Sequence, residues 1–301
     1  MRRLCLAMCM AVSVMSLGGC LSMFGEISEE EHAERTLMSV NEYTGEEYRL
    51  RGGQATNDLA QELFPDIEEA VQAFFREEYK TDVIVHNAVG ASGGATVFVE
   101  SVGEPHFHTF AIIPIDTENK RVRAEDVWTE EGQVEQSLFG GLLAMIMEDE
   151  FKALEEYLVG LTKEYPVVGF RQEAVNNVIA SGYTTPYFFI QPLSMDELEG
   201  INQLYLDNPD IRKEELREHF DVESYEANDL SITVELFMSE PKMDPDEEIF
   251  NMVVHDLETM EGIPRGAYAF LLRDNNVIKR TGTGNDRDYL RRNTPNKIIR
   301  D

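Results

Sequence analysis

All three cysteines of this 301-residue chain lie within its first 20 residues, at Cys5, Cys9 and Cys20. A body that folds beyond Cys20 therefore has no disulfide, no cysteine ligand for a metal ion and no thiol nucleophile. An exported body of this size without a disulfide is more typical of a Gram-positive envelope than of a periplasm.

The first 20 residues have the layout of a bacterial lipoprotein signal. Two arginines precede the apolar run 4–17, after which Gly18 and Gly19 lead directly to Cys20. A charged start, a short apolar run and small residues before the cut describe a secretory signal. The run of about 14 residues is shorter than the about 20 residues of a membrane-spanning helix. We therefore expect cleavage between Gly19 and Cys20 and a diacylglyceryl group on the Cys20 thiol.

Lipidation of Cys20 predicts a protein anchored in the lipid bilayer on the extracytoplasmic face of the cell membrane. Each buried methylene group of an acyl chain contributes about 0.8 kcal/mol, so two chains hold a protein more firmly than one. The alternative is an ordinary cleaved signal in which the cysteine has no role.

The chain is strongly acidic, with a formal charge of −31 that becomes −33 once Arg2 and Arg3 leave with the signal. Nucleic acid is excluded as a partner, because binding to phosphates requires positive charge. The C-terminus differs, since residues 277–301 hold seven basic and three acidic side chains. Its low apolar content predicts disorder. A functional alternative is contact with anionic lipid headgroups or wall-polymer phosphates.

Hydrophobic periodicity predicts an α+β fold, in which an antiparallel three-stranded meander with flanking helices precedes a second mixed α/β half. The meander comprises strands at 82–89, 95–102 and 106–115, which hairpin-sized connections join. Helices are expected at 65–80, 133–164, 171–180, 195–206, 211–219 and 246–260, and further strands at 186–191, 230–238 and 267–273.

Five parts of the chain are expected to behave differently. They are a signal peptide at 1–19, the lipidated cysteine with a flexible tether at 20–56, an N-terminal α+β half at 57–165, a C-terminal α+β half at 166–278 and a basic, disordered tail at 279–301. The tether assignment rests on its early glutamates and its glycines, and on the absence of a sustained helical or strand period.

Several segments of the chain resemble an uncharacterised lipoprotein family of staphylococci, bacilli and related Gram-positive bacteria. They read YTGE at 43–46, YKTDV at 79–83, GATVFVESVGEPHF at 94–107, VWTEEGQVE at 127–135, EYPVVG at 164–169 and GYTTPY at 182–187. The resemblance implies a Gram-positive membrane lipoprotein. It implies no activity, substrate or site, because the family is a domain of unknown function.

One pair of histidines is a candidate for metal chemistry. His106 and His108 stand two residues apart on a predicted strand, so both side chains project from one face. Glu104 precedes them in line, and Glu100 lies near on the preceding strand. Such a group suits zinc or copper. The alternative is two histidines on the polar side of a half-buried strand.

Three other patterns favour structural roles. Residues 90–94 match the G-x-S-x-G motif, but a strand follows where a nucleophile elbow requires a helix. Residues 207–210 resemble the start of a calcium loop but lack its glycine, which indicates a turn between helices. The aromatic residues Tyr183, Tyr187, Phe188 and Phe189 either line a ligand groove or pack in the core.

The leading hypothesis is a lipid-anchored, non-catalytic binding or interaction module of the cell envelope. Its partner would be an envelope protein or a wall polymer, and no cofactor and no catalytic residue is predicted. The alternative is a metal-binding protein or a metal-dependent hydrolase that uses His106 and His108.

Replacing Cys20 by alanine tests the predicted anchor, because the diacylglyceryl group is expected on this thiol and not on Cys5 or Cys9. In cells fed an alkyne-tagged fatty acid, we expect the label on the wild-type chain and on Cys9→Ala, and none on Cys20→Ala. Labelling of Cys20→Ala at the wild-type level would contradict lipidation at this residue.

Overall fold

The computed structural model describes residues 36–301 except 181, 194–197 and 223. The predicted signal, Cys20 and the first part of the tether lie outside these residues. The segment Thr36–Asp301 forms one unit with eight α-helices and an α+β fold, as predicted. No helix of the described segment is long and apolar enough to cross a membrane.

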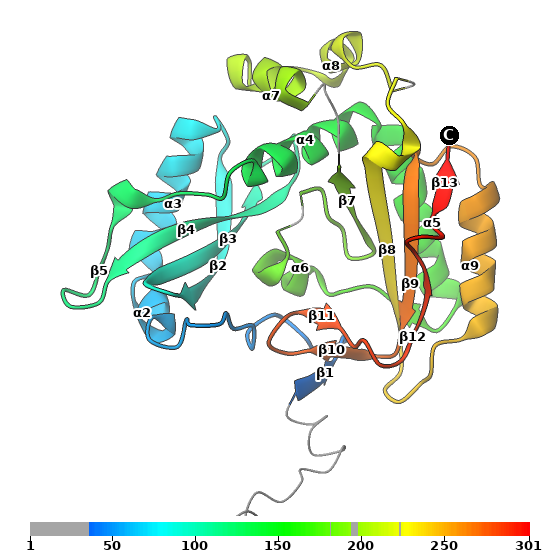
Figure 1. Ribbon diagram of the computed structural model, residues 1–301, viewed down its shortest axis with the longest axis horizontal. Helices are drawn as coiled ribbons and strands as arrows, with labels where there is room; N and C mark the ends of the chain where they lie inside the picture. The colour runs from blue at the N-terminus through cyan, green and yellow to red at the C-terminus, as the bar shows by residue number, and fades with distance from the viewer. Residues whose placement is uncertain (1–35, 181, 194–197, 223) are drawn as a thin grey trace, which may run out of the picture. The chain divides into compact units, whose positions relative to one another are not determined.

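The predicted meander is present and forms a four-stranded antiparallel sheet (Figure 1). Its strands follow chain order and are β2 (Val83–Ala91), β3 (Gly94–Ser101), β4 (His108–Asp116) and β5 (Arg121–Val122). Helices α2 (Asn57–Glu62) and α3 (Phe64–Glu78) cover one face. Pro65 and Asp66 in the first turn of α3 suit a helix start. Apolar α3 residues such as Phe75 then pack against the alternating valines of the sheet.

The second half contains a six-stranded sheet built around the parallel strands β8 (Leu230–Met238) and β9 (Gly266–Arg273). Parallel neighbours need a crossover connection, and α9 (Glu247–Thr259) supplies it. Strands β6 (Val167–Val168) and β7 (Phe188–Pro192) both pair with β8, while β12 (Tyr289–Arg292) and β13 (Ile298–Arg300) both pair with β9.

The predicted helix 133–164 is two helices, α4 (Gln133–Ile146) and α5 (Glu148–Glu164), which is a correction to the sequence interpretation. The chain leaves helical geometry at Met147. Three acidic residues, Glu148, Asp149 and Glu150, follow directly, and they favour a new helix start because they interact with its positive dipole end.

Helix α4 lies between the two large sheets and contacts β4, β7, α7 and α8 (Figure 1). The main apolar cluster therefore draws on both predicted halves, since Phe107 and Leu138 belong to it together with Val234. The remaining helices are α6 (Gln172–Val178), α7 (Leu198–Asp207) and α8 (Lys213–His219), with short 3-10 helices at Ala124–Asp126 and Ala227–Asp229.

The described part of the predicted tether is folded, which corrects its expected boundary at residue 56. Strand β1 (Leu37–Ser39) pairs with β10 (Asn276–Ile278), and β10 also pairs with β11 (Thr283–Gly284). Tyr43 is fully buried, and its hydroxyl donates to the carbonyl of Lys279 at 3.1 Å. Contacts with a distant segment order these residues, and a local period cannot reveal such contacts.

The predicted disordered tail at 279–301 is also wrong, because it contains β11, β12 and β13. The backbone of β9 supplies hydrogen-bond partners to β12 and β13. Two of the basic residues reach helix α9, since Arg292 and Arg300 contact the carboxylate and the carbonyl of Glu258. Charge-rich composition predicted disorder, but an open edge of the sheet orders the segment.

Two adjacent isoleucines in β13 test whether this segment contributes to stability. Ile298 is 3% exposed in the core and Ile299 is 46% exposed. We expect Ile298→Ala to lower the free energy of unfolding by about 2–4 kcal/mol, and Ile299→Ala to change it by less than about 0.5 kcal/mol. Urea unfolding measures both. Equal effects would contradict the packing of β13 on the core.

Candidate functional site

Three histidines and one glutamate gather where the strands of the meander end. His108 is the first residue of β4 and lies directly opposite Glu100 on β3. His106 precedes β4 by two residues, and its ring centroid is 5.3 Å from that of His108. The structure therefore brings the two predicted histidines together, with a carboxylate from the neighbouring strand.

His86 reaches the same group because β2 carries a bulge. Val85 pairs with Val99 and Asn87 pairs with Phe98, so His86 is an extra residue in the ladder. A bulge re-aims a side chain relative to the regular alternation. The Nε2 atom of His86 lies 2.6 Å from Oε2 of Glu100. The amino-acid sequence does not identify His86 as a member of this group, because no local pattern marks the bulge.

Glu100 links the histidines through its two carboxylate oxygens. While Oε2 accepts from His86, Oε1 lies 3.8 Å from Nε2 of His106. One potential ligand atom from each of Glu100, His106 and His108 lies within 4.8 Å of the other two. These three residues form the metal-ligand group, which we call the His-Glu group.

The buried ring of His108 has a defined tautomer. Its Nε2 atom lies 3.2 Å from Oδ1 of Asn176, and the same oxygen accepts from Nε2 of Gln172 at 2.7 Å. Because this amide oxygen only accepts, Nε2 of His108 carries the proton and Nδ1 keeps a free lone pair. Nδ1 is buried and has no hydrogen-bond partner among the described residues. It is one of several such side-chain atoms among the described residues, and it belongs to a residue of a group that could hold a metal ion.

Burial also keeps His108 in its neutral form. Desolvation lowers the pKa of this imidazole to about 4, against a partial opposing effect of the hydrogen bond to Asn176. The nearby imidazole of His106 lowers the pKa further. A neutral imidazole is the form that binds a metal ion.

The spacing of the His-Glu group suits a small tetrahedral ion after modest side-chain movement. Ligand atoms about 2 Å from zinc stand about 3.4 Å apart in a tetrahedral site. The ligand atoms of the His-Glu group lie within 4.8 Å of one another. Movements of about 1 Å in the imidazole rings and the carboxylate would bring them to the tetrahedral spacing. Three protein ligands leave a fourth position open, as in catalytic zinc sites.

Glu104, the third residue of the predicted metal site, lies outside the His-Glu group. Its carboxylate accepts a hydrogen bond from the backbone N–H of His106 at 3.3 Å. Glu100 takes its place because strand pairing sets it opposite His108, whereas Glu104 belongs to the connection between the strands. The register between β3 and β4 therefore determines which glutamate lies beside the two histidines.

A cavity of about 270 Å³ lies near His106, although no residue of the His-Glu group lines it. Glu104, Glu155 and Tyr183 line it, and the Tyr183 ring centroid is 6.1 Å from that of His106. Burial raises the pKa of Glu155, which the charge of His106 partly offsets. Burial and the Glu155 charge together raise the pKa of Tyr183 to about 12.

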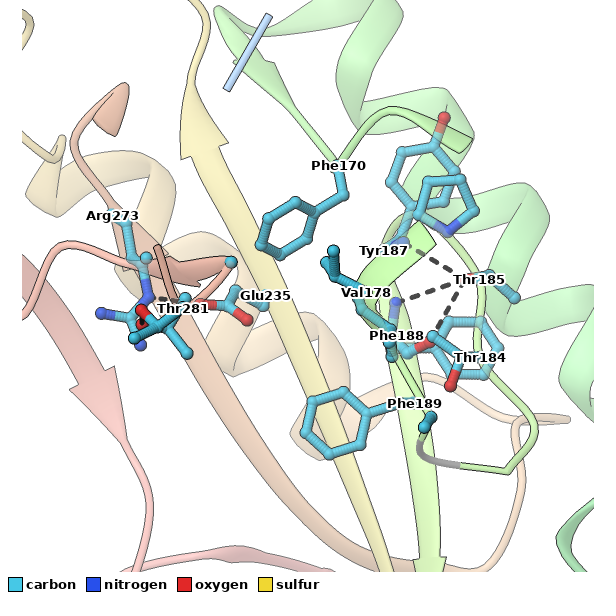
Figure 2. A pocket seen from close by; sticks show the side chains of 16 residues that line it. Phe170, Val178, Thr184, Thr185, Tyr187, Phe188, Phe189, Glu235, Arg273 and Thr281 are labelled. Carbon is cyan, nitrogen blue, oxygen red and sulfur yellow. Dashed lines mark hydrogen bonds and ion pairs between the residues drawn. The ribbon is translucent and has the colours of Figure 1, made fainter. Parts of the chain in front are cut away.

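A further cavity, of about 290 Å³, adjoins the predicted aromatic cluster (Figure 2). Tyr187, Phe188 and Phe189 line it, whereas Tyr183 packs against Phe151 and His106. Phe188 is 1% exposed and also belongs to the core, so core packing is confirmed for this residue, and ligand binding in the cavity stays a prediction.

The two motifs that were assigned structural roles occupy the expected places. Residues 90–94 form the hairpin between β2 and β3, and a strand follows them. Residues 207–210 connect α7 with α8.

The comparisons with known proteins identify a family and a fold. The model of a family described as "Protein of unknown function (DUF1672)" matches residues 30–300. The crystal structure of a DUF1672 family protein from Staphylococcus aureus subsp. aureus Mu50 superposes with a TM-score of 0.70 at 16% sequence identity. The alignment covers 88% of this chain and 98% of that chain. No curated protein matches this chain significantly.

The lowered pKa of His108 predicts how acid affects the metal-free protein. Between pH 6.5 and pH 4 the unfolded chain binds a proton at this imidazole that the folded chain does not bind. The free energy of unfolding therefore decreases as the pH is lowered through this window. The contribution of His108 to this decrease is roughly 3 kcal/mol. Urea unfolding at pH 7 and pH 4 should show this extra loss in the wild type relative to His108→Phe. Parallel losses would contradict it.

Proposed function

This chain belongs to the DUF1672 family of proteins of unknown function, and from its own residues we propose that it is a lipid-anchored envelope protein that binds a metal ion. Cys20 carries the anchor. Zinc or copper occupies the His-Glu group of Glu100, His106 and His108. The extracytoplasmic location rests on the signal-like first 20 residues.

One observation carries the metal proposal. The Nδ1 atom of His108 is buried with a free lone pair and no partner among the described residues, and His108 belongs to a group that also contains Glu100 and His106. A buried acceptor without a partner costs about 1–3 kcal/mol. A bound cation removes this cost, because the lone pair then becomes a coordination bond.

The donor set favours zinc or copper over calcium or magnesium. Imidazole nitrogen suits zinc and copper, whereas calcium and magnesium take oxygen ligands. The His-Glu group supplies two nitrogens and one carboxylate. The composition matches that of known His₂Glu zinc sites.

Neighbouring residues orient two of the three ligands. Asn176 fixes the tautomer and ring plane of His108, and His86 holds one oxygen of Glu100. Partners of this kind tune the affinity of a metal site by 10–100-fold in typical cases. Their presence supports a built site over a chance meeting of polar side chains.

A metal-dependent hydrolase is the second candidate function, and the cavity near His106 favours it. An open coordination position would face a substrate there, and Glu155 would act as the base. Hydrolysis of model esters that Glu155→Gln abolishes, with zinc content unchanged, would support this function. Zinc binding without any hydrolysis supports a metal-holding role.

Metal titration of chelator-stripped protein tests the main proposal. We expect one zinc or copper ion per chain by elemental analysis and a rise of several degrees in the melting temperature, because the ion binds only the folded state. Zinc binding should weaken by more than about 100-fold in His106→Ala and in Glu100→Gln.

His255→Ala is the matched control, because this exposed histidine on α9 lies outside the His-Glu group. It should bind zinc as the wild type does. Retention of stoichiometric, equally tight zinc by His106→Ala, or a melting temperature that no metal raises, would overturn the proposal.

A further inference from the structure

The cavity in Figure 2 shares no residue with the His-Glu group and has a different chemical character. Aromatic and aliphatic side chains, among them Phe170, Val178 and Phe189, form one wall. Glu235 of β8, Arg273 of β9 and the loop 281–284 also line the cavity. The cavity therefore combines an apolar wall with one acidic and one basic side chain, Glu235 and Arg273.

The side chain of Glu235 is nearly buried, and only one of its two carboxylate oxygens forms an ion pair or hydrogen bond with a described side chain. Its Oε1 pairs with Nε of Arg273, and its side chain is 15% exposed. No described residue donates a hydrogen bond to Oε2. Figure 2 shows the carboxylate among the side chains that line the cavity, which include Phe170 and Phe189. One acceptor oxygen is therefore left for a ligand.

Arg273 cannot turn to neutralise this oxygen, because four other contacts hold it. Its Nη1 donates to the carbonyl of Asn285 at 2.9 Å and lies 3.2 Å from Oδ1 of Asp286. Its guanidinium lies 4.9 Å from the ring centroid of Tyr289. The backbone of Gly284 packs so closely on the side chain that a Cβ there would lie 2.1 Å from Cδ of Arg273.

The charges of the two ionised lining residues, Glu235 and Arg273, balance each other, and Asp286, which does not line the cavity, adds a second negative charge beside Arg273. The single positive charge of Arg273 is shared between Glu235 and Asp286, so this set of three side chains has a net negative charge. An anionic ligand would be repelled, and a neutral apolar ligand would leave the free carboxylate oxygen desolvated without a partner. A cation satisfies the oxygen.

The apolar wall selects the kind of cation. Aromatic ring faces attract ammonium groups, and they also accept the alkyl substituents of an organic cation. A bare metal ion would find a single free carboxylate oxygen, whereas hard cations take six or more oxygen ligands. The volume of about 290 Å³ limits the ligand to a small molecule or a single side chain.

We propose that the cavity between Phe170, Phe189 and Glu235 binds a small organic cation, an ammonium head on a short apolar body. The ammonium lies beside Oε2 of Glu235, and the alkyl groups lie against the two phenylalanine rings. The strongly negative charge of the chain favours the approach of such a ligand. This inference is independent of the proposed metal site.

Calorimetric titration of purified full-length protein with choline tests the proposal, with 3,3-dimethylbutan-1-ol as the neutral compound of the same shape. We expect choline to bind and the neutral compound to bind at least about tenfold more weakly. Phe189→Leu keeps the apolar volume but removes the ring, and should weaken choline binding by about fivefold or more. Glu235→Gln should weaken it by at least about tenfold.

Two controls keep the result interpretable. Glu235→Gln also removes the ion pair with Arg273, so the melting temperature of this variant must show that it still folds. Phe170→Leu and Phe189→Leu test the same cavity and leave the ion pair in place. His106→Ala should bind choline as the wild type does, which separates this cavity from the metal site. No choline binding at 10 mM, about the upper limit for a weak specific site, equal binding of the neutral compound, or unchanged binding by both phenylalanine variants would overturn the proposal.

Discussion

The parallel pairing of β8 with β9 is the constraint on which the rest of the structure depends. Parallel neighbouring strands require a crossover connection. Helix α9, which lies between β8 and β9 in the chain, is this connection. The pair leaves two open edges, and β6 and β7 fill the edge of β8 while β12 and β13 fill that of β9. The same pair places Glu235 and Arg273 on adjacent strands, which positions the ion pair at the aromatic cavity.

The His-Glu group exists because the two halves meet at the start of β4. The backbone of His108 exchanges hydrogen bonds with Gly182 at 2.8 and 2.9 Å, so the second half covers the imidazole. Helix α4 comes close on another side, where a Cβ at Gly141 would lie 2.8 Å from the carbonyl oxygen of His106. Asn176 of α6 then completes the burial of His108 and sets its tautomer. The site therefore requires the packed body and not the meander alone.

The sequence predicted elements where the signal was local. The alternation of valines found β2 and β3, and proline and acidic residues found the start of α3. It predicted that His106 and His108 would lie together, because a two-residue spacing places side chains on one face. The sequence pattern predicted Glu104 as the carboxylate ligand, although strand register places Glu100 opposite His108. It did not identify His86 or Asn176, because a β-bulge and helix packing have no signature within a short window.

The amino-acid sequence by itself determined the features that composition and short-range pattern control. These are a body without cysteine, its strong negative charge, its α+β class and the pair His106 and His108. Only the tertiary structure decided which residues join that pair, and that the segments 36–56 and 279–301 are folded. The physical reason is that burial and strand pairing between distant segments supply the free energy that orders them, and no local period encodes those partners.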